Sequence, residues 1–427
     1  MKTRWIIVLG MIFLFSLGIL GEKSQAAEPM TLEAIMQEAL RNNREIAALR
    51  EQWTAMKHRI PQASALPDPM VGYSFMGPNM IETRVGPREE VYEFEQMIPF
   101  PGKLYEKRQM ASAEAEAAEA EFKAVEREVV FKVSEAYYDL YATQAILQVT
   151  ENIQELLKKF ENIAQSRYAS QQSEQRDVAK AQAEVSDNLK QIFILRQQKE
   201  SLAAMLNALL NRRSAGGIEE IEEPKLPPLN LSLEELLERA KKNRPELLEA
   251  IAVRARDQHA NALAKYEYAP DFFVGFEYSK IGEGMTTDPD DGQDAWMIPI
   301  KVTVPLWQNR IIPAVQEAKR NLKSSEAKLE NIENLTEYEL KNAFYRFQSA
   351  YKIVELYNNA LIPQAELAFR SDQAGYEAGR TDILNLLDSE RVFFNAKMAY
   401  YQAFADALKS FATIERILGA DLNNKGS

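Results

Sequence analysis

The 427-residue chain has no cysteine and only two histidines, His58 and His259. Without cysteine there are no disulfides and no thiol nucleophile, so the fold must be held by packing alone. Each histidine lies near the end of a predicted helix without a second histidine nearby, and one imidazole alone cannot build a soft metal site. We therefore expect both to be surface residues, and we expect no resident metal.

Basic residues are also in the minority, because 51 Lys and Arg stand against 63 Asp and Glu and give a net charge of −12. Such a chain is a poor nucleic-acid binder. The sequence has no phosphate-cradling glycine loop, no paired catalytic motif and no zinc-protease helix. Neither an enzyme nor a nucleic-acid partner is expected.

Long apolar runs are missing except at the N-terminus, where one extends from Trp5 to Leu20 behind two basic residues. It is short for a membrane-spanning helix of about 20 residues, and small residues follow it. Residues 1–27 therefore predict a secretory signal peptide, cleaved near Ala26 or Ala27. An exported chain without a later apolar helix is destined for the periplasm, the medium or an outer-membrane β-barrel.

What the chain does contain is an internal repeat. LEAIMQEALRNNREI from Leu32 recurs as LEELLERAKKNRPEL from Leu233, and Tyr168 matches Tyr376. Matches between these points keep their order. We predict two copies, 28–215 and 231–420, a proline-rich acidic linker at 216–230 and a C-terminal tail at 421–427.

Each copy has the same predicted plan. A helix begins after a capping residue, Thr31 or Ser232, and ends before Pro67 or Pro270. Two short runs of alternating polarity then predict a β-hairpin, and a long alanine-rich helix and a returning helix follow. The strands are expected at 70–76, 91–98, 272–279 and 295–304, the long connections at 77–90 and 280–294, and the helices at 105–168, 177–211, 315–376 (interrupted only by Pro363) and 382–418.

The strands alternate as lipid-facing strands do. In the last one Trp296, Ile298 and Ile300 share a face, although Pro299 counts against a regular strand. Four strands cannot close a membrane barrel, so three chains would supply twelve. A soluble two-hairpin sheet packed on helices is the alternative. In the barrel interpretation the lumen residues are Glu93, Glu95, Glu277 and Lys301.

Two clusters near the hairpins are open to a metal interpretation. Four methionines near the first hairpin suit copper or silver, but methionine more often fills gaps in packing. An acidic run in the last connection lacks the ligand spacing of a calcium-binding hand and is expected to be a solvated exterior loop. The methionines are Met70, Met76, Met80 and Met97, and the acids are Asp288, Asp290, Asp291 and Asp294.

With these features the sequence resembles the TolC family of outer-membrane efflux channels over the whole mature chain. GYEAGRTDILNLLDSE from Gly375 resembles the family's tyrosine-glycine motif at the periplasmic helical tip, and RYASQQSEQRDVAKAQ from Arg167 is a degenerate copy with Ser170 and Gln171 where glycine is usual. EFEQMIPFPGKL from Glu93 is similar to the strand-to-helix junction of members that serve heavy-metal exporters.

The resemblance implies a mainly α-helical homotrimer in the outer membrane of a Gram-negative bacterium, with a twelve-stranded barrel in the lipid and a twelve-helix tunnel in the periplasm. Its partners would be a periplasmic adaptor and an inner-membrane pump, with no cofactor. It also implies a periplasmic gate at Tyr376, Gly379, Thr381, Asn385 and Asp388. Thr381 and Asn385 depart from a well-known drug exporter, which has arginine and aspartate there. A periplasmic coiled-coil adaptor or structural protein is the alternative, and the duplication argues against it. The substrate, metal ions or small toxic compounds, stays open.

Overall fold

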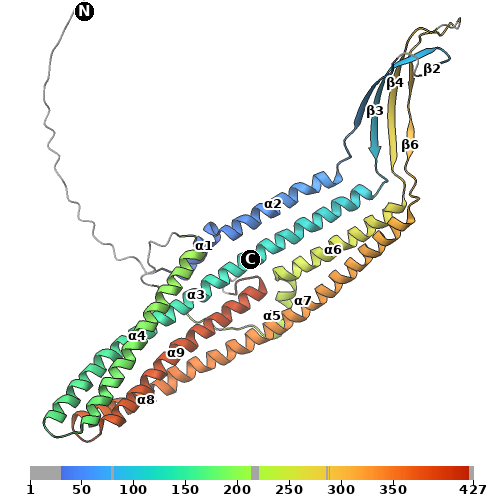
Figure 1. The fold of residues 1–427 in the computed structure, drawn as a ribbon. Helices are drawn as coiled ribbons and strands as arrows, with labels where there is room; N and C mark the ends of the chain where they lie inside the picture. The colour runs from blue at the N-terminus through green and yellow to red at the C-terminus, as the bar shows by residue number, and fades with distance from the viewer. Residues whose placement is uncertain (1–29, 78–80, 213–220, 285–286, 288, 423–427) are drawn as a thin grey trace, which may run out of the picture.

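The computed structural model describes residues 30–77, 81–212, 221–284, 287 and 289–422. The molecule is elongated: a sheet forms one end, helical turns form the other, and long helices run between them (Figure 1). The predicted mainly α-helical class with a small antiparallel sheet is confirmed.

Both copies follow the same plan of two helices, a β-hairpin, a long helix and a returning helix. The first copy consists of α1 (Leu32–Asn42), α2 (Arg44–Ser64), β1 (Met70–Phe75), β2 (Glu82–Thr83), β3 (Gly86–Ile98), α3 (Lys103–Ala169) and α4 (Gln175–Leu209). The second consists of α5 (Leu233–Asn243), α6 (Pro245–Lys265), the 3₁₀ turn η1 (Tyr266–Tyr268), β4 (Phe272–Ile281), β5 (Ala295–Met297), β6 (Ile300–Val302), α7 (Gln308–Leu356), the π-turn η2 (Tyr357–Leu361), α8 (Ile362–Glu377) and α9 (Ile383–Leu418).

The prediction of one continuous first helix per copy is wrong, because each is broken into two. Asn43 is extended and caps α2, its Oδ1 accepting from the backbone N–H groups of Glu45 (2.9 Å) and Ile46 (3.2 Å). Arg244 is extended because Pro245 follows it and disfavours the helical conformation in the preceding residue. The axes of α1 and α5 can therefore point in a different direction from those of α2 and α6.

Strands and helices share one lateral order. The sheet runs β1, β3, β4, then β5 and β6, and these strands adjoin α2, α3, α6 and α7 in the same order. Farther from the sheet α3 packs against α4 and α9, and α9 packs against α7 and α8. The chain therefore forms a wall. The unpaired edge strands β1 and β5–β6 lie on the same two sides of this wall as the helices that adjoin them, α2 and α7.

The last strand is shorter than predicted and is split at Pro299. Tyr278 faces Trp296 and Val274 faces Ile300, so β5 and β6 keep a single register against β4. Gly275 donates to the carbonyl of Pro299 (2.9 Å), but proline has no N–H to return the bond. A Cβ on Gly275 would lie 2.9 Å from the proline ring, so glycine makes room for it.

The two connections beyond the sheet are more ordered than predicted. β2 and the start of β3 lie within the first, and Gly292 donates to the carbonyl of Val85 in it (2.8 Å). The acidic run is not simply solvated: Asp291 accepts from the backbone of Gly284 (3.0 Å) and Asp294 from that of Ile281 (3.0 Å). Asp288 lies outside the described residues.

A single inserted residue explains the π-turn. The two copies are offset by 207 residues at Tyr137 and Phe344, but by 208 at Tyr168 and Tyr376. Between these points α3 is continuous, whereas η2 contains an Ile362 N–H bond to the carbonyl of Tyr357, five residues back. A π-turn absorbs one extra residue without rotating the helix beyond it. The second long helix is thus interrupted by η2 just before Pro363, which itself lies in the first turn of α8.

Deleting Asn359 tests this account. The deletion alone places Pro363 in a regular α-helix and should cost about 3 kcal/mol. Combined with Pro363→Glu, which copies Glu155 of the uninterrupted α3, the deletion should leave the thermal midpoint near that of the parent chain. Asn359→Ala keeps the length and is the control. Equal destabilisation of the single and combined variants would contradict a one-residue insertion.

Candidate functional site

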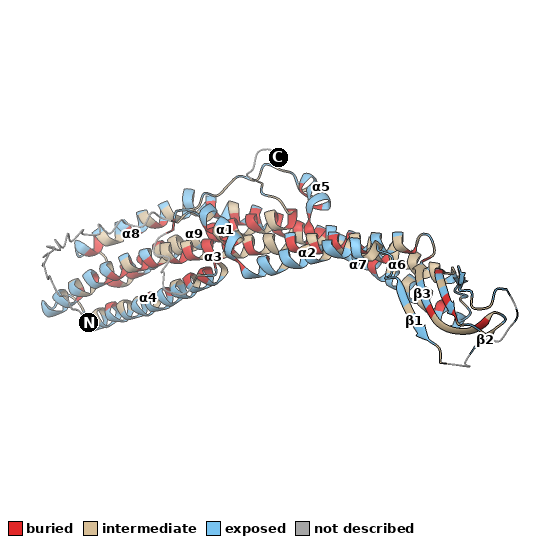
Figure 2. Cartoon of the chain, turned by 90° about the horizontal axis from the view of Figure 1, so that it is seen from above, coloured by how far each residue is buried: buried red, intermediate tan, exposed pale blue. Residues whose placement is uncertain are grey.

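One face of the sheet carries exposed apolar side chains. Figure 2 shows much of the sheet, β1 above all, in the pale blue of exposed residues. Cross-strand rows on this face join Val71 to Phe94 and Phe276, and Tyr73 to Tyr92, Tyr278 and Trp296. Their exposed fractions run from 36% at Tyr278 to 80% at Val71. An apolar surface this continuous requires a cover, and lipid is the one that suits alternating strands.

The opposite face is polar and carries all four predicted lumen residues. Glu93 faces Glu277 across β3 and β4, and Lys301 forms an ion pair with Glu95. Arg88 pairs with Glu277 and its Nε donates to Ser279 Oγ (2.9 Å). The sequence reasoning missed Arg88 because it placed this residue in a loop. That the face lines a lumen stays a prediction.

The methionines and histidines lie on several different elements. Met70 on β1 and Met97 on β3 share the polar face, and Met80 lies outside the described residues. His58 is exposed, but His259 is half-buried and its Nδ1 lies 2.7 Å from Glu106 Oε2, so it is not the free surface residue we expected. No group of three or more His, Cys, Asp or Glu residues in the described ranges is arranged to hold a metal.

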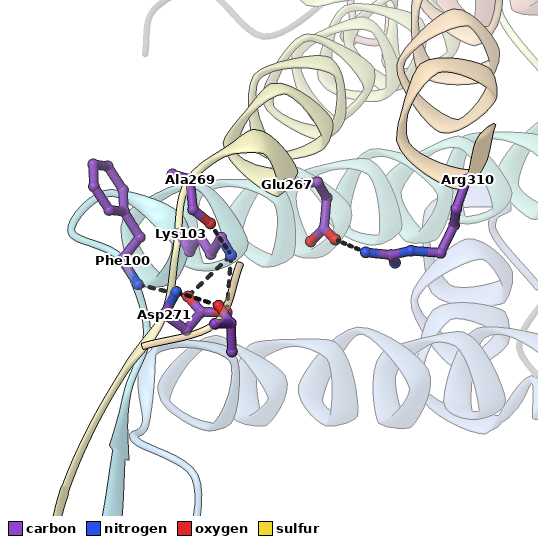
Figure 3. Close-up of polar contacts among 7 residues, drawn as sticks. Phe100, Lys103, Glu267, Ala269, Asp271 and Arg310 are labelled. Atoms are coloured by element: carbon purple, nitrogen blue, oxygen red, sulfur yellow. Dashed lines mark hydrogen bonds and ion pairs between the residues drawn. The ribbon is translucent and has the colours of Figure 1, made fainter. Parts of the chain in front are cut away.

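The junction between sheet and helices is fixed by one carboxylate, Asp271 (Figure 3). Its oxygens lie 2.9 and 3.0 Å from Lys103 Nζ, and Oδ1 also accepts from the backbone of Phe100 (2.8 Å). The backbone N–H of Asp271 donates to Thr303 Oγ1 (2.7 Å). β3, α3, β4 and the segment after β6 are thus tied at one point.

Gly102 makes this arrangement possible. Its φ of 104° is a conformation that side chains rarely adopt, and a Cβ would lie 2.9 Å from the ring of Tyr266. The glycine turns the chain from β3 into α3 so that Lys103, the next residue, enters the junction buried. The Pro-Gly-Lys of the sequence motif therefore has a local structural role that the sequence alone did not reveal.

At the opposite end both helical hairpins turn in the same way. In the second copy Gly379 (φ 73°) donates to the carbonyl of Tyr376 (3.0 Å). In the first copy Gln171 (φ 58°) donates to that of Tyr168 (3.0 Å). Gln171 is strained there, because a left-handed conformation costs a side-chain residue about 1–2 kcal/mol. The glycine missing from the first copy has therefore not changed the turn.

Tyr376 is buried, 3% exposed, and Arg167 of the first copy holds it. The guanidinium carbon lies 4.3 Å from the ring centroid, and Nη2 donates to the carbonyls of Tyr376 and Glu377, the latter at 3.5 Å. Burial raises the pKa of the Tyr376 hydroxyl. Sequence reasoning noted that Thr381 replaces an arginine; it missed that Arg167 brings one from the other hairpin.

The other predicted gate residues, Thr381, Asn385 and Asp388, come after the Gly379 turn in the sequence. Thr381 lies against Gly375, where a Cβ would meet its Oγ1. Asp382 caps α9 by accepting from the backbone of Asn385 (2.9 Å), and the side chains of Asn385 and Asp388 are exposed, three residues apart on one face. Their roles as gate residues stay predictions.

Glu390 is an unexpected buried carboxyl group at this end, 4% exposed on α9. Burial raises its pKa to about 7, Glu184 of α4 adds to the shift and Arg391 opposes it. Arg391 itself pairs with Glu184. The helical tip thus contains a carboxyl group that titrates near neutral pH.

Comparison with known proteins defines the class. The profile of the family described as outer membrane efflux protein matches residues 35–212 and 236–420, one match in each copy. The cobalt-zinc-cadmium resistance protein CzcC of Cupriavidus metallidurans is 22% identical, with 92% of this chain and 91% of that protein covered. Among solved structures, the outer-membrane channel OprN has a TM-score of 0.77 at 19% identity, covering 91% of this chain and 90% of that one. VceC of Vibrio cholerae has 0.77 at 18%, covering 91% and 96%.

The chain therefore belongs to the outer membrane efflux protein family, since the profile covers most of its length. It is an outer-membrane efflux duct, with its sheet at the membrane end and its helical wall on the periplasmic side. The family is one of channels rather than enzymes. Within the described residues, no helix has an apolar stretch long enough to cross a lipid bilayer.

Arg167→Ala should loosen the tip. It removes the stacking on Tyr376 and two bonds to carbonyls, together worth about 1–2 kcal/mol at a half-exposed site. Amide hydrogen exchange at 376–381 should become roughly tenfold faster. Arg176→Ala, on the exposed start of α4, is the matched control and should leave these amides unchanged. The same exchange in parent and Arg167→Ala would show that the arginine does not hold the two hairpins together.

Glu390→Gln should stabilise the protein only at high pH. Because folding raises the pKa of Glu390, its carboxyl group leaves the free energy of unfolding unaffected below about pH 4.5. As the pH rises through 7 the free energy of unfolding falls, and above that pH it is lower by up to about 3 kcal/mol. The neutral amide avoids that loss. Thermal midpoints at pH 5 should agree between variant and parent and diverge by pH 8.5, whereas Glu366→Gln, at a residue paired with Arg370, should show no such gain. A pH-independent difference would rule out titration of Glu390.

Proposed function

We propose that three copies of this chain close into a passive exit duct, with the apolar sheet face against lipid and Glu93, Glu95, Glu277 and Lys301 toward the lumen. The observation that carries the proposal is the coincidence of free edges. β1 on one side and β5–β6 on the other are unpaired in the described chain, and open strand edges do not occur in a bilayer.

The same edges of the helical wall carry apolar side chains suited to subunit contacts. Phe193 on α4 is 60% exposed, and Leu356 and Leu367 on the α7–α8 side are 53% and 72% exposed. Contact of one edge with the opposite edge of the next copy is heterologous, and such contacts close into a ring when the rotation allows. Four strands per chain favour three copies and twelve strands.

In this proposal the duct works with a periplasmic adaptor and an inner-membrane pump, which supplies the energy and selects the substrate. The similarity to a cobalt-zinc-cadmium resistance protein supports metal ions as cargo over other small toxic compounds. The cargo passes through without a cofactor or a chemical step. The alternative, a periplasmic adaptor, would leave the exposed apolar sheet face without a function.

We also propose that the tip is the gate. Arg167 and Tyr376 hold the two hairpins together, and Asp388 contributes a threefold acidic ring if the α8–α9 hairpin lies nearer the axis. The first copy has Lys180 at the equivalent position, offset by 208. The charge ring therefore depends on which hairpin is innermost.

The assembly is tested by size. In detergent the mature protein should be a trimer of roughly 135 kDa, three chains of about 45 kDa, by light scattering corrected for bound detergent. Trp296→Arg, on the apolar face, should reduce membrane assembly, because an arginine facing lipid costs up to about 2–4 kcal/mol. A monomer that remains soluble without detergent would be incompatible with the barrel.

The gate is tested by charge. Asp388→Ala should lower cation selectivity and block by multivalent cations in planar bilayers, because three carboxylates near a narrow axis concentrate cations. Lys180→Ala should change neither property if only the α8–α9 hairpin lies at the axis. Unchanged selectivity and block in Asp388→Ala would remove Asp388 from the gate, and equal and opposite effects of the two variants would indicate an alternating ring.

A further inference from the structure

The two copies differ at mid-height of the helical wall. In the first copy two stretches of chain cross α3, one just before α1 and the other after α4. Met30 and Ile221 pair as a parallel bridge, and Glu222 N–H donates to the carbonyl of Met30 (3.3 Å). The hydroxyl of Tyr137 lies 2.7 Å from the Glu222 carbonyl and 3.1 Å from that of Met30.

In the second copy only the first of these stretches is present among the described residues. Leu231 is the counterpart of Met30, at the offset of 201, and lies before α5. Beside it is a cavity of about 420 Å³ between residues 228–231 and α7. Its lining includes Leu229, Leu231, Phe344, Phe347, Gln348 and Tyr351.

This cavity is the counterpart of the place that Ile221–Glu223 fills in the first copy. At the offset of 207, Phe344 corresponds to Tyr137 and Gln348 to Tyr141. Tyr137 contacts the carbonyl of Glu222, and the Tyr141 hydroxyl bonds the carboxylate of Glu223. The two sites therefore share their position on the helix, and among the described residues only the first copy has a second stretch of chain there.

We propose that this groove on α7 binds an extended segment of a partner polypeptide, parallel to residues 229–231, in which a branched apolar residue is followed by two carboxylates.

The first copy specifies the chemistry of that segment. Ile221 is 7% exposed in its own site, and Phe347 and Tyr351 offer an apolar floor on α7. The carboxylate that Tyr141 binds in the first copy would meet the amide of Gln348 and the ammonium of Lys352, which is exposed at the rim. Backbone pairing with an exposed segment supplies affinity, and the side-chain pockets supply specificity.

The groove is also accessible to a partner from outside the helical wall. Glu222 and Glu223 are exposed in the first copy although helices flank α3 on both sides, so the crossing segments lie outside the wall. α5, which follows residues 228–231, likewise stands out from the row of long helices (Figure 2).

The test uses the mature full-length protein in detergent and a fluorescent peptide with the sequence of residues 217–227, GIEEIEEPKLP. Fluorescence anisotropy should show saturable binding of one peptide per chain. Lys352→Glu, an exposed change that does not disturb folding, should weaken binding about tenfold, and Tyr351→Ala should do the same. Gln348→Tyr, which copies Tyr141, should strengthen it.

The controls separate this groove from other surfaces. Gln144→Ala, at the first-copy counterpart of Tyr351, should leave affinity unchanged because that site is already filled. A peptide with serine in place of both isoleucines should not bind. Absence of saturable binding, or equal affinity for the serine peptide, overturns the proposal. Binding only to a chain truncated after Leu422 assigns the groove to residues 423–427, and binding only to dissociated subunits assigns it to a subunit contact; either result also overturns it.

Discussion

The architecture depends on the ion pair between Lys103 and Asp271. Both side chains are largely buried, 9% and 16% exposed, and removing one partner of such a pair costs about 3–5 kcal/mol because the other charge stays buried. The pair fixes the direction in which strands of both copies continue into helices. The sheet and the helical wall have the same lateral order. The angle between strands and helices at this junction therefore determines whether the edge strands and the edge helices can close in the same proposed ring. An error at the junction would therefore affect lipid-facing and periplasmic parts together.

Duplication gave the two copies the same tip turn and the same helix order, and the departures from equality are where function is expected. The tip uses Tyr376 from one copy and Arg167 from the other, so the hairpins are joined by unlike partners. One inserted residue produces a π-turn in the second copy, and Tyr137 and Phe344 differ where, within the described residues, a second stretch of chain crosses the first copy and not the second. Three identical chains can thus form a ring with six similar but inequivalent hairpins.

The sequence predicted what periodicity and repetition control: the helical class, the hairpins, and the common face of Glu93, Glu95, Glu277 and Lys301. It did not predict the breaks at Asn43 and Arg244, although the Arg-Pro step was a usable signal. It missed Arg167, Lys103, Asp271 and Glu390 because their roles come from contacts between segments over 160 residues apart or from burial, and neither leaves a local pattern. The split at Pro299 depends on which neighbour lies opposite, which is equally non-local.

The helical tip combines features that lower its stability: a left-handed Gln171, and Glu390 buried near Glu184. Each destabilises this arrangement of the hairpins by about 1–3 kcal/mol at neutral pH. Arg167 and the packing of Tyr376 on Phe160 oppose them with contributions of similar size. A tip in which opposing contributions nearly cancel can change its arrangement with little energy input, whereas the junction ties β3, α3, β4 and the segment after β6 together through Asp271. The junction at the sheet end is therefore expected to be the more rigid part of the duct, and the helical tip the more responsive one.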